Sequence, residues 1–202
     1  MQYEYDEFLK NMAIIEEINT IHEHLKNNLN YPNDLGDLLR TQITQSVSAF
    51  DKFMHDIVRK GMIEIFLGNR PVTKGYEKYT INLKLYNDLK SFSTYPPEYI
   101  LELDLIEKQG YISYQDIGKI KEGLSMIWIE DHKWQVLSND MSIAERALKT
   151  EFKNIIIRRN QIVHEFDVDL ITRIRRQITE ADTDRTKKFI AELVKVIFNR
   201  VK

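Results

Sequence analysis

The chain has 202 residues, of which 7 are Gly and 4 are Pro, about half the usual share of each residue. Few Gly and Pro residues argue against Gly-rich phosphate loops, multi-turn β-sandwiches and Pro-rich disorder. With 43% hydrophobic residues, 30% charged residues and a net charge of −2, the composition predicts a soluble, largely helical chain with one sizeable core.

The chain holds no Cys, which excludes disulfides, thiolate metal sites and a Cys nucleophile. Its acidic start lacks the basic-then-apolar layout of a signal peptide. No apolar run approaches the roughly 18 residues that a membrane span needs. We therefore expect a cytoplasmic protein that has no membrane partner.

Two long amphipathic helices are expected first. Apolar residues recur at steps of three and four over 8–29 and again over 35–65, which is the helical period. The segment 31–34 contains Pro32 and separates the two helices, and the second is expected to stop near Gly68.

The middle of the chain is less regular. We expect a short helix over about 80–89 and a helix opened by Pro96-Pro97 and closed by Gly110. Ser113 with Asp116 resembles a cap before another helix, which runs to about Ile127. Residues 128–140 are expected to form a loop or a short extended segment.

The last third is helical again. A capping box over 142–145 predicts the start of a helix that reaches His164 without a breaker. Residues 165–178 are mixed in character, and Thr179 caps a final helix. Together the elements predict an all-α protein, an antiparallel helical bundle. We expect one domain over 1–202 with an inserted helical or irregular lobe at about 70–140.

Charge is distributed unevenly along the chain. Residues 145–202 hold 14 basic and 9 acidic side chains, a net charge of +5, so the first 144 residues carry −7. A basic segment of this kind is often only a solvated helix surface, but it also suits an anionic ligand.

The string Arg159-Asn160-Gln161-Ile162-Val163-His164 carries the chemistry. It combines a permanent cation, an amide and the side chain that titrates near neutral pH. Asn160 and His164 share a helix face, whereas Arg159 and His164 lie about 140° apart around the axis at ~3.6 residues per turn. The Arg159 and His164 side chains of one helix therefore cannot easily reach the same atom. In two copies of the helix related by a twofold axis, Arg159 of one chain can approach His164 of the other.

This string resembles the Arg-x(4–6)-His signature of HEPN domains, in which Asn often follows the Arg. The segments 38–40, 47–56, 159–165 and 176–180 resemble the RiboL-PSP-type HEPN branch, and the resemblance spans roughly 35–200. It implies an all-α homodimer, and often a metal-independent endoribonuclease of toxin–antitoxin or phage-defence systems. An antitoxin or a nucleotidyltransferase is then a possible partner, and no cofactor is implied.

The residues suit that chemistry. RNA is cut without metal when its 2′-hydroxyl attacks the adjacent phosphorus, which needs a base, an acid and cations. His164 can act as base or acid, Arg159 can hold two phosphate oxygens, and Asn160 can bind phosphate or fix the imidazole tautomer. Two His164 side chains across a dimer would supply both base and acid.

Other candidates have structural alternatives. Arg40 and Arg158 are candidates to contact RNA, but Arg40 suits a salt bridge equally well. Asp51 and Glu165 are candidate supporting residues, and Asp51 suits an intrahelical pair with His55 or an orienting contact to the motif helix.

No metal site is expected. Glu165, Asp167 and Asp169 resemble a metal cluster only superficially. His22 and His24 point to opposite sides of a helix.

The favoured function is a metal-independent endoribonuclease with a composite site in a homodimer interface. A non-catalytic HEPN module that binds RNA, a nucleotide or a partner protein is the alternative. In a third interpretation the motif is purely structural, with His164 stabilising the end of a helix.

Overall fold

The computed structural model describes residues 1–91 and 95–202. Within these residues the chain is all-α and contains no strand, only an isolated bridge between Val168 and Arg175. The elements are α1 (Gln2–Glu23), the π-helical turn η1 (His24–Asn28), α2 (Gly36–Phe66), α3 (Lys74–Glu77), α4 (Leu83–Lys90), α5 (Pro97–Gln109), α6 (Ile117–Ile127), α7 (Lys133–Asp140), α8 (Glu145–His164) and α9 (Glu180–Val201).

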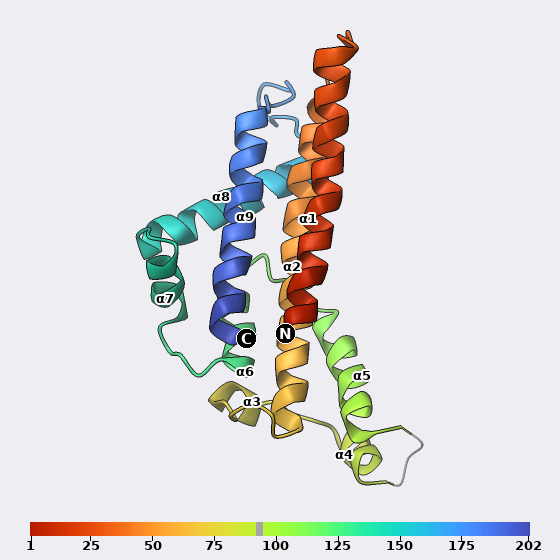
Figure 1. Ribbon diagram of the computed structural model, residues 1–202, viewed down its shortest axis with the longest axis vertical. Coiled ribbons are helices and arrows are strands. Elements are labelled where there is room, and N and C mark those ends of the chain that lie inside the picture. The colour runs from red at the N-terminus through yellow and green to blue at the C-terminus, as the bar shows by residue number, and fades with distance from the viewer. Residues whose placement is uncertain (92–94) are drawn as a thin grey trace.

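Three long helices lie side by side at the centre of the molecule (Figure 1). Helix α1 runs antiparallel to α2 and α9, and α2 contacts α1, α9, α6, α8 and α5. The apolar stripe of α2 is almost completely buried, with Val47, Phe50, Met54 and Ile57 all at 0% exposure. The predicted antiparallel helical arrangement is confirmed, and its core is organised around α2.

The two ends of the chain meet near the end of α2. The amino terminus pairs with Glu64 at 3.7 Å, and Arg70 pairs with the same carboxylate at 3.2 Å. Arg70 also donates a hydrogen bond to the carbonyl of Val201 at the end of α9. These contacts attach both terminal helices to α2.

Residues 70–140 contain α3 to α7, and α5 and α6 pack against α2. The cap expected from Ser113 with Asp116 is formed by Asp116 alone, whose carboxylate accepts hydrogen bonds from the amides of Gly118 and Lys119 at 2.8 and 3.0 Å. The organisation of the chain as one domain with an inserted lobe stays a prediction.

Two local predictions are wrong. The loop expected over 128–140 contains helix α7, because Trp134 and Leu137 are buried and give the segment an inner helical face. The capping box over 142–145 does not form. Ala144 occupies the N-cap position of α8 without a side-chain hydrogen bond, and Ser142 has a positive φ of 55°. The Thr179 cap of α9 is confirmed, since its hydroxyl accepts from the Asp182 amide at 3.1 Å.

Candidate functional site

One face of helix α8 is anchored in the core, upstream of the motif. Leu148, Phe152, Ile155 and Ile156 are buried on that face, at 9% exposure or less. Arg159, Asn160 and His164 follow in the last turn and a half of the helix. Arg159 lies one turn beyond Ile155 and continues the buried stripe, whereas Asn160 and His164 are exposed. Apolar packing therefore fixes the rotation of α8 and leaves Asn160 and His164 exposed at its end.

The motif side chains are accessible. Asn160 and His164 are exposed and Arg159 is half-buried. Arg159 Nη1 donates to Asn160 Oδ1 at 3.1 Å, while Arg159 Nε is buried without a hydrogen-bond partner. The imidazole of His164 makes no hydrogen bond or ion pair in the part of the chain that the structure describes, so neither ring nitrogen is occupied by another described residue.

A tight reversal ends α8 directly after His164. The amides of Glu165 and Asp167 both donate to the carbonyl of Gln161, at 3.1 and 2.9 Å. Phe166 and Asp167 have positive φ angles of 54° and 57°, a conformation that is rare for residues with a side chain. Something must hold two consecutive residues in this conformation.

Asp167 is the residue that holds the reversal in place. Its carboxylate is completely buried and bridges two arginines: Arg40 Nε donates to Oδ2 at 2.6 Å, and Arg158 Nη2 donates to the same oxygen at 2.9 Å. Arg158 Nη1 donates to the second oxygen, Oδ1. We call Arg40, Asp167 and Arg158 the arginine–aspartate bridge; it connects α2, α8 and the segment that follows His164.

Arg40 and Arg158 also bind the backbone of the segment that precedes α9. Arg40 Nη2 donates to the carbonyl of Arg176 at 2.7 Å, and Arg158 Nη2 donates to the carbonyl of Gln177 at 2.9 Å. Both cations thus satisfy backbone groups that the irregular segment leaves without helical partners.

A third arginine, Arg176, pairs with two carboxylates of this segment. Arg176 Nη1 donates to Glu165 Oε2 at 3.0 Å and to the carbonyl of Val168 at 2.8 Å, and its Nη2 approaches Asp169 Oδ2 at 3.5 Å. The backbone amides of Thr172 and Ile171 donate to Asp169 and hold the pKa of that carboxyl below its usual value. The residues after His164 therefore form an ordered loop that is held together by hydrogen bonds and ion pairs.

The structure separates the predicted site residues into two groups. Arg159, Asn160 and His164 lie together at an accessible helix end. Arg40 is 4% exposed and Arg158 is paired, which favours a structural role for both over the RNA contacts expected from the sequence.

The candidate supporting residues lie in different places. Glu165 holds the loop through Arg176, as described above. Asp51 Oδ1 accepts from the amide of Tyr114 at 2.6 Å, and its Oδ2 lies 3.7 Å from His55 Nε2. The intrahelical pair thus forms, and Asp51 positions the segment before α6.

Asp167 was missed as a site residue because its partner Arg40 lies 127 positions away. The carboxylates after His164 hold arginines, so they are poorly placed to bind a metal. In the described part of the chain, the side chains that could hold a metal together are His22, Glu23 and Glu180, at the end of α1 and the start of α9.

No helix of the described residues is both long and apolar enough to cross a membrane. No curated protein and no solved structure matches the chain significantly. A family model does match: the one described as RiboL-PSP-HEPN aligns with residues 11–202. The match covers nearly the whole chain, including α2, α8 and the Arg-Asn-x3-His motif, and the chain therefore belongs to the RiboL-PSP-HEPN family.

Proposed function

We propose that this protein is a metal-independent endoribonuclease whose site forms where two copies of the chain meet. The observation that carries the proposal is the end of α8, where an exposed His164 stands one turn from Asn160 and close in sequence to Arg159. HEPN domains are often RNases or nucleotide-binding proteins, and these three residue types suit a phosphodiester better than a neutral ligand.

The reaction needs only groups that the chain and the RNA supply. A neutral imidazole removes the proton of the 2′-hydroxyl, and the freed oxygen forms a bond to the adjacent phosphorus. The bond from phosphorus to the 5′-oxygen breaks, and a protonated imidazole donates a proton to that oxygen. The products are a 2′,3′-cyclic phosphate and a 5′-hydroxyl. Each proton transfer contributes roughly 10²–10⁴ in rate, and Arg159 stabilises the charge that develops on the phosphorane oxygens.

A second copy of the chain supplies what one helix end lacks. One His164 cannot be base and acid in the same step, and Arg159 points about 140° away from it around an ideal helix at ~3.6 residues per turn. A twofold axis near the end of α8 would bring two His164 and two Arg159 side chains together.

The surface around the motif supports this pairing. Exposed apolar side chains lie on and just after the end of α8: Val163 is 48% exposed, Phe166 73%, Leu170 60% and Ile171 92%. Apolar groups gathered on one surface are typical of an interaction site. A copy of the same patch would cover them and place the basic segment of both chains around the site.

The test is RNA cleavage by the purified full chain in EDTA, with the ends of the products identified. Wild-type protein should cut and leave 2′,3′-cyclic phosphate ends, and His164→Ala should lower the rate by roughly 10² or more. His132→Ala is the matched control, because His132 is exposed and lies outside the motif; it should cut like the wild type. Loss of cutting in EDTA, or full cutting by His164→Ala, would contradict the proposal.

A role as a toxin or phage-defence effector in the cytoplasm would follow from RNA cutting. Expression of the wild type in a bacterium should then slow growth and degrade RNA, and His164→Ala should relieve both effects. Equal growth of the two strains would instead favour a non-catalytic binding module.

A further inference from the structure

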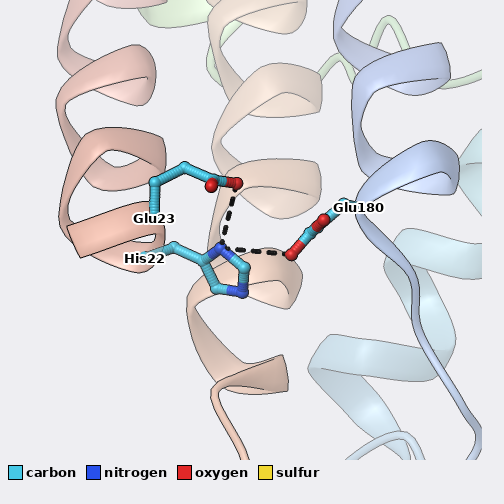
Figure 2. Close-up of side chains that lie close together, drawn as sticks. All are labelled: His22, Glu23 and Glu180. Carbon is cyan, nitrogen blue, oxygen red and sulfur yellow. Dashed lines mark ion pairs between the residues drawn. The ribbon is translucent and has the colours of Figure 1, made fainter. Parts of the chain in front are cut away.

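At the end of the bundle where α1 meets α9, a buried histidine faces two carboxylates. His22 is 3% exposed, and its Nδ1 has no hydrogen-bond partner. Figure 2 shows this nitrogen directed between the side chains of Glu23, its neighbour in α1, and Glu180, the first residue of α9. The ion pairs drawn in Figure 2 leave this buried nitrogen without a hydrogen bond, and a buried polar atom without one calls for an explanation.

The distances at this cluster do not fit direct hydrogen bonds. His22 Nδ1 lies 3.7 Å from Glu23 Oε1 and 3.7 Å from Glu180 Oε1, beyond the 2.7–3.2 Å range of an N–H···O bond. Zinc takes imidazole nitrogen and carboxylate oxygen at about 2.0–2.2 Å, which places two ligand atoms roughly 3.4 Å apart at a tetrahedral angle. The observed separations are close to that value.

From these observations we propose that His22, Glu23 and Glu180 form a site for a divalent transition-metal ion of the zinc class. One imidazole and two carboxylates are ligands that zinc accepts. The cluster borders an open hollow that is also lined by Lys26, Asn30 and Tyr31, so water can reach the ion as a further ligand. The ion would tie the end of α1 to the start of α9.

The residues around the cluster already hold its carboxylates in place. Asn27 donates to Glu23 Oε2, and Lys26 donates to Glu180 Oε1; both come from the π-helical turn η1. A π-helical turn inside or next to an α-helix is frequently found at functional sites. The ammonium of Lys26 occupies the oxygen that faces His22, so it competes with a metal ion for Glu180.

This site uses none of the residues assigned to RNA cleavage. The ion would connect the end of α1 to the start of α9, so its role in this proposal is structural. Removal of the ion would leave the proposed cleavage chemistry intact, so a metal-binding experiment separates this inference from the proposed nuclease.

The experiment measures Zn²⁺ binding to the full chain, without an affinity tag, by competition with a chromogenic chelator. The wild type should bind one equivalent, and His22→Gln should bind at least about tenfold more weakly, since it removes the imidazole. His24→Gln is the matched control because His24 lies two residues away and is exposed; it should bind like the wild type. Lys26→Met should bind several-fold more tightly because it frees Glu180.

His22 is buried, so its variant is checked by circular dichroism, and Glu180→Gln provides a second test at a partly exposed position. Zn²⁺ should raise the Tm of the wild type and of His24→Gln, but not that of Glu180→Gln. Zinc affinity in a folded His22→Gln or Glu180→Gln protein equal to that of the wild type would overturn the proposal. So would a wild type that binds no Zn²⁺.

Discussion

Replacing Asp167 with Asn tests the arginine–aspartate bridge most severely, because Asn keeps the shape of the side chain and removes its charge. Arg40 has 5% of its side chain exposed, and Asp167 has none. Removal of one partner from a buried ion pair costs about 3–5 kcal/mol, since the other charge stays buried without compensation. The side chain of Arg158 is 23% exposed, so water can solvate its guanidinium when the carboxylate of Asp167 is removed. We expect Asp167→Asn to lower the free energy of unfolding by about 3 kcal/mol.

Urea denaturation followed by circular dichroism measures this change. Asp169→Asn is the matched control: Asp169 is also a carboxylate that contacts an arginine, but its side chain is 37% exposed, so its loss should lower the free energy of unfolding far less than the loss of Asp167. Arg40→Met in the Asp167→Asn background should recover part of the loss, because it removes the uncompensated cation. If Asp167→Asn lost no more stability than Asp169→Asn, the reasoning would be refuted.

Two further outcomes test the interface and the core. Ile171→Asp should leave the helical content unchanged and convert a dimer to a monomer in analytical ultracentrifugation, because Ile171 is 92% exposed in the single chain; a variant that remains dimeric would show that this patch is not the interface. Burial, with Asp51 and Glu122 nearby, raises the pKa of the Tyr114 phenol above its usual value. The phenol therefore ionises first in the unfolded chain, and the stability it contributes is complete below about pH 10 and is lost as the pH rises further. Tyr114→Phe should lose less stability than the wild type between pH 10 and 11 in urea titrations, and an equal loss would contradict this assignment.

The helices could be predicted where periodicity and breakers agree. The long apolar stripe predicted α2 because a helix buries one face at a fixed period. Pro96 and Pro97 predicted the start of α5 because proline is tolerated in the first turn of a helix. Helix α7 was missed because it is short: within its eight residues the inner face is marked by only a few apolar side chains. The cap before α8 was misplaced because the backbone at Ser142 adopts a positive φ, which residue type alone does not reveal.

Only the site residues that lie close together in the sequence could be predicted. Arg159, Asn160 and His164 lie within six residues and could be found from the motif. The pairing of Asp167 with Arg40 could not, because Arg40 lies 127 positions away in a different helix. The group of His22 and Glu180 is likewise assembled only when α1 packs against α9.

The most direct test of the central claim, one site built from two chains, is a mixing experiment. Wild-type chains are equilibrated with an equal amount of His164→Ala chains, and RNA cleavage in EDTA is compared with that of an all-wild-type sample at the same total concentration. If each site needs both imidazoles, only dimers of two wild-type chains cut, and random pairing of the two chain types leaves about a quarter of the activity. If each chain cut alone, about half of the activity would remain, and that result would contradict the composite site.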